Sequence, residues 1–469
     1  MKLNLYKYTL LICLITNGCA PKIATLTPNT SSSLVLHPSS FSLDELQHRT
    51  FNYFWDLADA HQQIPDRYPN LQFSSIAATG FGLTAYLIGV ERKYISRKQA
   101  AERTLKTLQA LINLPQGAAA TGVSGYKGLF YHFLDHKNSL RYRDVELSTI
   151  DTGLLMAGIL SAQSYFDQDN PAETQIRTLA DTLFRRVEWD WSMGTNQNVM
   201  SMGWKPENGF IPAKWIGYNE AMVLVIMAMG SPTHPLPATA WQGWTSGYKW
   251  NKYRGQEYVD FAPLFGHQYS QMYIDFKGIQ DDYMAKKGID YFENSRRATL
   301  TNKAYCLANP QAYPNYADNE WGLTACDGPK DTTATDPNGK TRKYQGYSAR
   351  GASSTEENDD GTIAPTAAAG SLPFAPEICL PVLKNLWTKY QTNLVGKYGF
   401  KDAYNPTFTY GIANESGWFD PDYLGIDQGP IIIQIENYRS QFVWNLMKKN
   451  KYITTGLKKA GFKGGWLDK

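Results

Sequence analysis

The sequence predicts an all-α protein, an (α/α)6 barrel (toroid) with short β decorations and a long rim loop. After residue 40, apolar residues recur at helical spacing almost throughout the 469-residue chain. Stretches that are apolar on every side alternate with stretches that carry one apolar stripe. Because a helix apolar all round is buried and a striped helix lies outside, the alternation predicts six inner and six outer helices. We expect residues 41–469 to form a single domain.

Each inner helix is expected from an apolar stretch, and each outer helix from an amphipathic one. The expected inner helices cover residues 75–90, 148–166, 219–230, 258–276, 362–374 and 428–448. The amphipathic stretches cover residues 96–113, 170–187, 286–305 and 376–394, and residues 42–60 supply the sixth outer helix, which closes the ring. Ser42 and Glu45 form a capping box at the start of that helix.

Between the helices we expect short β-like turns over residues 120–145 and 192–216. The most polar stretch, residues 327–361, is expected to be the rim loop. A loop of this length inside a compact domain is usually functional or disordered.

The N-terminus resembles an export signal. Lys2 and Lys7 precede an apolar run over residues 8–16 that is too short to span a bilayer. We therefore expect a signal peptide over residues 1–19. Cys19 follows Gly18 and resembles the lipid-modified cysteine of bacterial lipoproteins; ordinary cleavage nearby is the alternative.

Residues 20–40 are rich in Ser, Thr and Pro and are expected to form a tether. The expected location is the periplasm, or an outer-membrane-anchored lipoprotein of a Gram-negative bacterium. Membrane contact is then expected only through the lipid anchor.

Composition excludes some classes of partner. Lys and Arg total 46 against 43 Asp and Glu, so no concentrated basic charge favours nucleic acid. Seven His and five Cys without close pairing argue against a zinc site, and we expect no metal and no cofactor. The 30 Tyr and 13 Trp suit a protein that stacks rings on sugars, although a rich core explains them equally well. We expect a monomer.

Three cysteines remain beyond the expected signal. Export makes disulfides possible. Cys306 and Cys326 would close a loop of modest length and form the preferred disulfide. Three free buried thiols, with Cys379 as the third, are the alternative.

Acidic residues gather before the second inner helix. Ser148 and Asp151 form a capping box, which places Asp151 in the first turn. Asp144 and Glu146 lie just ahead on the rim loop. These acids are candidate catalytic groups; helix capping and local ion pairs are the alternative.

Two further acids stand at the starts of inner helices. Glu220 opens an otherwise apolar helix after Asn219, a plausible cap. A carboxyl at an apolar rim tends to have a raised pKa, as a general acid requires, but the helix dipole opposes this and a dipole-complementing role is the alternative. Asp427 precedes Pro430 in the last inner helix, and Asp420 and Asp422 lie close by.

Acids facing each other across a sugar-sized cleft are typical of glycosidases, in which one carboxylic acid protonates the leaving oxygen and a second group activates water or attacks. Aromatic and polar side chains near these acids are candidate substrate-binding groups, with packing as the alternative for the aromatics and a structural role for His267. They are Tyr126, Phe130, Trp204, Trp215, Tyr218, His267, Trp321, Thr362, Thr366 and Trp418.

Long stretches around these residues resemble the bacterial endo-β-1,2-glucanases of glycoside hydrolase family 144. They are YRDVELSTIDTGLL, FIPAKWIGYNEAMVLVIMAMGSPTHPLP, EWGLTACDGP, DGTIAPTAAAGSLPF and WFDPDYLGIDQGPIIIQIENYRS, within a likeness that runs from about residue 42 to 466. The resemblance implies an (α/α)6 barrel that hydrolyses β-1,2-glucan to short oligosaccharides such as sophorose, with inversion and no metal.

By the same resemblance, Glu220 in YNEAM is the proton donor, and Asp144, Glu146, Asp151 and Asp427 match the remaining acids. The segment around 330–358 is longer than the resemblance leads us to expect, and the Cys306 and Cys326 pair is not part of it. We therefore expect an exported β-1,2-glucan hydrolase. The alternatives are an exo-acting, sophorose-releasing or other β-glucan hydrolase, and a lipid-anchored glycan-binding protein without activity.

Overall fold

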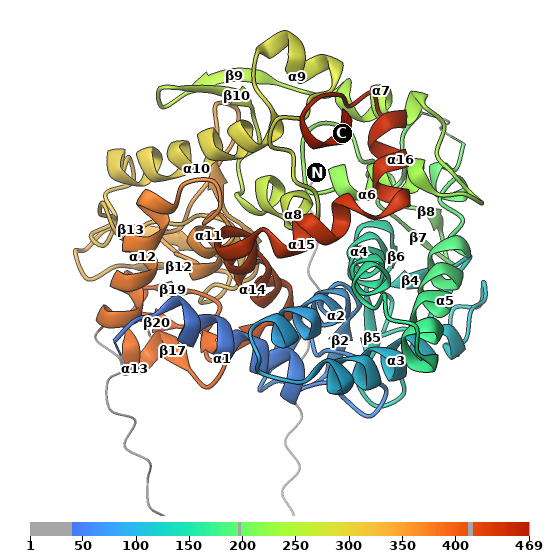
Figure 1. The fold of residues 1–469 in the computed structure, drawn as a ribbon. Coiled ribbons are helices and arrows are strands. Elements are labelled where there is room, and N and C mark those ends of the chain that lie inside the picture. Colours follow the sequence, from blue (N-terminus) through green and yellow to red (C-terminus); the bar gives the residue numbers. More distant parts are fainter. Residues whose placement is uncertain (1–39, 196–197, 411–415, 469) are drawn as a thin grey trace, which may run out of the picture. The chain divides into compact units, whose positions relative to one another are not determined.

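Helices dominate the computed structural model, which describes residues 40–195, 198–410 and 416–468 (Figure 1). Among these residues, no helix combines the length and apolar character needed to cross a bilayer. The α-helices are α1 (Leu43–Asp56), α2 (Ile76–Glu91), α3 (Arg97–Asn113), α4 (Thr149–Tyr165), α5 (Pro171–Arg185), α6 (Met222–Gly230), α7 (Thr239–Thr245), α8 (Phe265–Tyr273), α9 (Asp282–Lys287), α10 (Tyr291–Ala308), α11 (Pro365–Ala369), α12 (Pro376–Lys389), α13 (Gln391–Leu394), α14 (Gly425–Ser440), α15 (Phe442–Lys448) and α16 (Lys451–Lys459). Short 3-10 helices cover Trp191–Met193 and Gly465–Asp468.

The strands are short, as expected for decorations of a helical body. They are β1 (Arg67–Tyr68), β2 (Phe73–Ser75), β3 (Gly125–Tyr126), β4 (Leu129–Tyr131), β5 (Phe133–Asp135), β6 (Leu147–Ser148), β7 (Gly203–Lys205), β8 (Gly209–Phe210), β9 (Trp250–Tyr253), β10 (Gln256–Val259), β11 (Ala325–Cys326), β12 (Thr332–Thr335), β13 (Thr341–Tyr344), β14 (Ser348–Ala349), β15 (Gly351–Ala352), β16 (Glu357–Asn358), β17 (Val395–Gly396), β18 (Gly399–Phe400), β19 (Tyr404–Asn405), β20 (Trp418–Phe419) and β21 (Tyr423–Leu424). The expected β-like turns over 120–145 and 192–216 are confirmed, because β3, β4, β6, β7 and β8 form one antiparallel sheet.

The apolar helices pack on one another. Helix α2 packs against α4 on one side and α14 on the other, α4 packs against α6, and α6 against α8. Helix α14 also contacts α8 and α11. The striped helices α3 and α5 pack outside α2 and α4, as the hydrophobic patterns predict.

Three inner helices begin directly after a short strand. β2 leads into α2, β6 into α4 and β21 into α14. Ser75 and Ser148 cap α2 and α4 by accepting hydrogen bonds from the amides of Ala78 and Asp151. The first turns of α4 and α14 carry Asp151 and Asp427 next to these strands.

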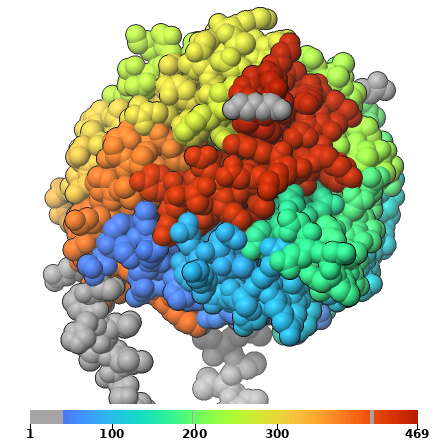
Figure 2. Space-filling model, in the orientation of Figure 1, coloured from blue at the N-terminus to red at the C-terminus, as the bar shows by residue number. Residues whose placement is uncertain are grey.

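Several helices differ from the expectation. The inner helix expected over 258–276 is only α8, because residues 256–259 pair with β9 in a hairpin. The helix expected over 428–448 breaks at Gln441, whose φ is 58°. The outer partner of α6 is α16, from the C-terminus. In Figure 2 this C-terminal segment (red) lies against the green segment.

The polar rim loop is folded. β12 and β13 form a hairpin, β14 pairs with β11, and β15 pairs with β16. Arg342 and Asp336, both buried, form an ion pair at 2.5 Å within the hairpin. Residues 327–361 are therefore an ordered arm, which we call the arm below.

The expected Cys306–Cys326 disulfide is wrong. Both thiols are free and buried, as is Cys379. Cys306 packs among the apolar residues around α10 and α12, whereas Cys326 packs with Ala364 and Ala403 beside the Arg350 guanidinium. Since the two sulfurs belong to different apolar clusters, their spacing along the chain does not bring them together.

Helices α2 and α4 cross at a contact that only glycine allows. A Cβ added to Gly158 would lie 2.0 Å from the carbonyl oxygen of Gly80. Gly158→Ala is therefore expected to lower the free energy of unfolding by about 1–3 kcal/mol through overpacking. Thermal unfolding measures this. The control is Gly346→Ala, whose added Cβ would meet its nearest atom at 3.9 Å; equal melting temperatures for both variants would contradict the prediction.

Candidate active site

The first turn of α4 holds two of the expected acids in place. The Ser148 hydroxyl accepts a hydrogen bond from the Asp151 amide at 3.2 Å and donates one to the Asp151 carboxylate at 2.5 Å. Asp151 is buried, and burial raises its pKa. Glu146 lies beside it because β6 carries it to the start of α4.

His132 joins these two acids. Its Nδ1 lies 2.9 Å from a Glu146 oxygen and its Nε2 lies 3.6 Å from an Asp151 oxygen. Burial alone would lower the pKa of His132, but the carboxylates of Asp151 and Glu146 outweigh it and raise the pKa to about 9. Burial would raise the pKa of Glu146, but the hydrogen bond with His132 outweighs it and lowers that pKa. At neutral pH the imidazolium therefore bridges two carboxyl groups.

Asp144 is placed apart from this group. It is exposed on the turn before Glu146 and does not line either of the two cavities described below. The structure therefore brings Glu146 and Asp151 together, but not Asp144.

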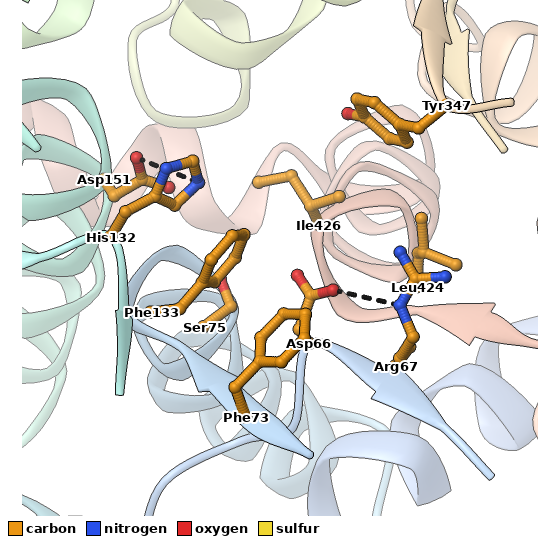
Figure 3. A pocket seen from close by; sticks show the side chains of 10 residues that line it. All are labelled: Asp66, Arg67, Phe73, Ser75, His132, Phe133, Asp151, Tyr347, Leu424 and Ile426. Atoms are coloured by element: carbon orange, nitrogen blue, oxygen red, sulfur yellow. Dashed lines mark ion pairs between the residues drawn. The ribbon is translucent and has the colours of Figure 1, made fainter. Parts of the chain in front are cut away.

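A first cavity of about 340 Å³ opens beside His132 and Asp151. Figure 3 shows these two side chains on one side of it and Asp66 with Arg67 on another. Its other lining residues are Phe73, Ser75, Phe133, Tyr347, Leu424 and Ile426. Burial raises the pKa of Asp66 to about 6, even though Arg67 lies 3.4 Å from its carboxylate.

Phe73 and Phe133 form an aromatic wall of this cavity. Their rings lie 4.6 Å apart, and the Tyr142 ring lies 4.7 Å from Phe73. The Phe133 ring also stacks on His132 at 4.0 Å. An aromatic face beside charged groups suits a sugar, whose ring has apolar faces and polar edges.

A pair of buried carboxyl groups lies close to this cavity, with Asp427 in the first turn of α14 and Asp402 in the segment that follows β18. Asp427 and Asp402 interact, and burial raises the pKa of each. One oxygen of each has no hydrogen-bond partner among the described residues. Since two adjacent buried carboxylates repel each other, the pair retains a proton near neutral pH.

A third group of acids surrounds Arg67. Carboxylate oxygens of Asp327, Asp420 and Asp422 lie within 4.8 Å of one another, which is a spacing that a cation could bridge. Arg67 supplies positive charge there, with Nη1 2.7 Å from Asp327 and 3.6 Å from Asp422. We infer that the guanidinium of Arg67 neutralises the charge of these carboxylates.

A second cavity, of about 370 Å³, contains Glu220. Helix α6 begins at Met222, so Glu220 lies in the turn before it and not at its first position. The side chain of Asn219 accepts a hydrogen bond from the Ala221 amide at 3.0 Å and shapes that turn. Burial raises the pKa of Glu220 to about 7, and the nearby charge of Asp151 adds to the shift.

The two cavities share a wall at the start of α4. Trp215 lines the second cavity and donates a hydrogen bond from Nε1 to the Thr149 hydroxyl at 2.8 Å. Asp151, two residues further on, lines the first cavity. Across from them, the Tyr269 hydroxyl lies near both Glu220 and Asp427 and donates to the Ile426 carbonyl at 3.3 Å. The acids therefore gather around one junction.

Of the ten expected substrate-binding residues, Trp215 and Tyr218 line the second cavity. His267 has a structural role: its Nε2 lies 3.1 Å from the Phe261 carbonyl oxygen, and burial lowers its pKa to about 4. Thr366 donates to the carbonyl of Asp427 at 3.1 Å and so supports an acid from behind.

The remaining six line neither of these two cavities. Tyr126 and Trp204 pack edge-to-face against Trp191. Phe130 and Trp321 are fully buried. The Thr362 hydroxyl accepts a hydrogen bond from Asn405, and Trp418 packs on the cluster around Cys326. Aromatic residues near an acid in sequence are thus mainly core residues here.

Sequence reasoning missed the groups that neighbouring strands bring in. His132 meets Glu146 because β4 pairs with β6, which places Tyr131 opposite Leu147. Asp66 and Arg67 lie at the first cavity because β1 pairs with β21. No local pattern marks these residues, and only the strand register reveals them.

Comparison with known proteins places this arrangement among carbohydrate-active proteins. The glycoamylase family model, described as "Putative glucoamylase", matches residues 212–451. A solved structure of the same description from Bacteroides uniformis is 33% identical, with a TM-score of 0.78, and covers 92% of this chain and 100% of its own.

Two relatives have more specific names. The endo-β-1,2-glucanase of Chitinophaga pinensis, solved with sophorotriose and glucose, is 29% identical with a TM-score of 0.77, over 91% of this chain and 100% of its own. An exo-β-1,2-glucooligosaccharide sophorohydrolase (non-reducing end) of Parabacteroides distasonis is 29% identical over 89% of this chain. The chain spans 57% of the length of that curated relative.

The charge on His132 predicts a pH-dependent stability. Its pKa in the folded protein is about 9 against 6.5 in the unfolded chain, so its stabilisation is complete below pH 6.5 and is lost as pH rises through 9. His132→Asn should therefore flatten the fall in melting temperature between pH 6.5 and 9.5, measured by calorimetry. His234→Asn, at a partly exposed histidine, is the control; an unchanged slope in His132→Asn would disprove the coupling.

Proposed function

Because the chain belongs to the glycoamylase family, we propose that it is a glycoside hydrolase that cleaves β-1,2-glucan to short β-1,2-glucooligosaccharides. The observation that carries the proposal is Glu220, a carboxyl group with a pKa of about 7 that lines the second cavity and lies near Asp151 of the first. Two relatives that cover 89% and 91% of the chain are named for action on β-1,2-linked glucose chains.

We also infer that the inner and outer helices form an (α/α)6 barrel. The packing of α2 on α4, α4 on α6, α6 on α8, and α14 on both α8 and α2 supports a closed circuit of inner helices. Helix α11 packs on α14. It is also joined to α8, because Gln268 of α8 donates hydrogen bonds to Ala367 in α11 and to Ser371 just after it.

In the proposed reaction Glu220 gives its proton to the glycosidic oxygen as the bond to the anomeric carbon breaks. A water molecule attacks that carbon from the opposite face, and a carboxylate takes the water's proton. The product is then α-configured. No metal enters this scheme.

Two carboxylates qualify as the group that activates water. Asp151 lies near enough to Glu220 for its charge to raise the pKa of that acid, and His132 and Ser148 hold it in place. Asp427, paired with Asp402, is the other. Asp151→Asn and Asp427→Asn compared on the acid side of the pH profile would distinguish them, because only the true base sets that limb.

A second candidate is exo action that releases sophorose. The name of the Parabacteroides relative favours it. Product profiles separate the two, because an endo enzyme first gives a ladder of oligosaccharides and an exo enzyme gives one short product from the start.

Residues 1–39, which lie outside the described residues, support a proposal about location. We propose export, with Cys19 as the lipid-bearing residue and residues 20–40 as the tether, in the periplasm or on the outer membrane.

Glu220→Gln is expected to lower kcat by about 10²- to 10⁴-fold, because an amide cannot donate the proton. In the wild type, kcat/KM should fall as pH rises through about 7, since the raised pKa keeps Glu220 protonated only below it. Reducing ends released from linear β-1,2-glucan measure both effects.

Glu102→Gln on α3 is the matched control, because this glutamate is exposed on an outer helix. Wild-type rates in Glu220→Gln would refute the assignment of the proton donor.

Cys19→Ser is expected to abolish incorporation of labelled palmitate in a Gram-negative host and to move the protein from the membrane fraction to the soluble fraction. Cys13→Ser, within the expected signal, is the control and should keep the label. A Cys19→Ser protein that still carries palmitate would contradict the proposed anchor.

A further inference from the structure

The arm of residues 327–361 borders both cavities. Tyr347 lines the first cavity, and Ser353, Thr355 and Glu356 line the second. Asp151 lines the first cavity and the nearby Glu220 lines the second, and both lie outside the arm. A single short stretch of the arm therefore reaches both sides of the point where we place bond cleavage.

Arg350 fixes this stretch between its two ends. The guanidinium is fully buried and binds both oxygens of Asp360, at 2.7 and 2.9 Å. It also donates to the carbonyl oxygens of Gln345 and Gly346, at 3.1 and 3.0 Å. Since bidentate buried pairs of this kind restrict geometry, the backbone just before Tyr347 is held rigidly.

The Gln345 side of the turn has further support. The Gln345 amide donates to Asp360 at 3.0 Å, and its side chain donates to Asn358 at 2.7 Å. The Ser348 hydroxyl donates back to the Gln345 side chain at 3.0 Å. Tyr347 therefore projects from a turn whose flanking residues are bonded on both sides.

The Tyr347 ring itself is left open. It is 56% exposed although it lines a cavity, and Figure 3 shows it across the cavity from His132 and Phe133. A large aromatic side chain that is held by its backbone and more than half exposed loses little entropy when another ring stacks on it. The faces of a glucosyl ring carry C–H groups and suit such stacking.

The other end of this stretch is polar. Ser353 is buried, and its hydroxyl accepts hydrogen bonds from the amides of Thr355 and Glu356 at 3.2 Å each. The turn is also tied down by Ser354, whose hydroxyl donates to Asp260 at 2.5 Å. The exposed Glu356 carboxylate thus stands at the second cavity as a hydrogen-bond acceptor for sugar hydroxyls.

We propose that the arm holds the glucan chain on both sides of the scissile bond, with Tyr347 as the stacking platform on one side and Glu356 as a hydrogen-bonding group on the other. The proposal rests on the proposed function for the identity of the sugar. It makes Tyr347 a residue that binds substrate and takes no part in proton transfer.

The test measures binding separately from turnover. In a Glu220→Gln background, calorimetry with a β-1,2-glucooligosaccharide of about six units should show a Kd roughly tenfold higher for Tyr347→Ala, the loss expected from one stacking contact. Tyr347→Phe should retain the affinity, since the ring remains. Tyr438→Ala, at an exposed tyrosine of α14 outside both cavities, is the matched control and should leave Kd unchanged.

Turnover by the otherwise wild-type enzyme gives a second readout. Tyr347→Ala should raise KM for linear β-1,2-glucan roughly tenfold with kcat within about threefold of wild type. Glu356→Gln should shift the ratio of disaccharide to trisaccharide products. Unchanged Kd and KM in Tyr347→Ala would overturn the proposal.

Failure of the proposed function looks different. If the wild type released no reducing ends yet the oligosaccharide bound with a Tyr347-dependent Kd, hydrolysis would be refuted and the platform retained. If neither the wild type nor the Glu220→Gln variant bound the oligosaccharide, both proposals would fall.

Discussion

The cap between Ser148 and the amide of Asp151 is the interaction on which the site depends. It fixes the first turn of α4. In that turn Thr149 accepts a hydrogen bond from Trp215, and Asp151 pairs with His132. Glu146 lies directly before β6, the strand that ends at the cap, and β6 pairs with the strand that leads to His132. Both cavities therefore take one wall from the same junction of strand and helix.

Around that junction, acidic side chains are concentrated and basic side chains are sparse. Burial raises the pKa of Asp66, Asp151, Glu220 and Asp427, and among the described residues near the first cavity Arg67 and His132 supply the compensating positive charge. Such a cluster costs folding free energy, since ionised carboxylates are poorly solvated there. A substrate with many hydroxyl donors would satisfy those oxygens. Under the proposed function, the arrangement would lower stability in return for the capacity to bind polar sugars.

The sequence predicted most of the helical framework because hydrophobic periodicity reports burial directly. Helices α2, α4 and α5 lie close to their expected ranges. Prediction failed where a distant segment competes for the same place: α16 covers α6 from the C-terminus, and β10 takes residues expected to be helical. These outcomes depend on tertiary packing, which local propensity does not encode.

The candidate site was predicted in part for the same reason. Asp151 and Asp427 lie in the first turns of helices, Glu220 lies in the turn before α6, and Glu146 lies just ahead of the cap of α4. The sequence marks these places through caps and apolar runs. His132 and Arg67 depend on strand register and leave no local signal. Tyr126 and Tyr347 look alike in sequence, yet Tyr126 packs against Trp191 while Tyr347 stays open. An aromatic residue in a core and one on a platform differ only in what covers the ring.

The pKa of Glu220 shows which of two opposing effects dominates. The hydrogen bond from the residue's own amide lowers the pKa, and the N-terminus of a helix in general favours a charged carboxylate. Burial opposes them and prevails, because helix α6 begins two residues later and its first amides are not directed to the carboxyl group by a cap. Substrate in both cavities would exclude more water and strengthen burial further. A bound glucan chain would thus favour the protonated form of Glu220, which cleavage of that chain requires. By holding the chain on both sides of the scissile bond, the arm would help to keep Glu220 protonated without contacting it.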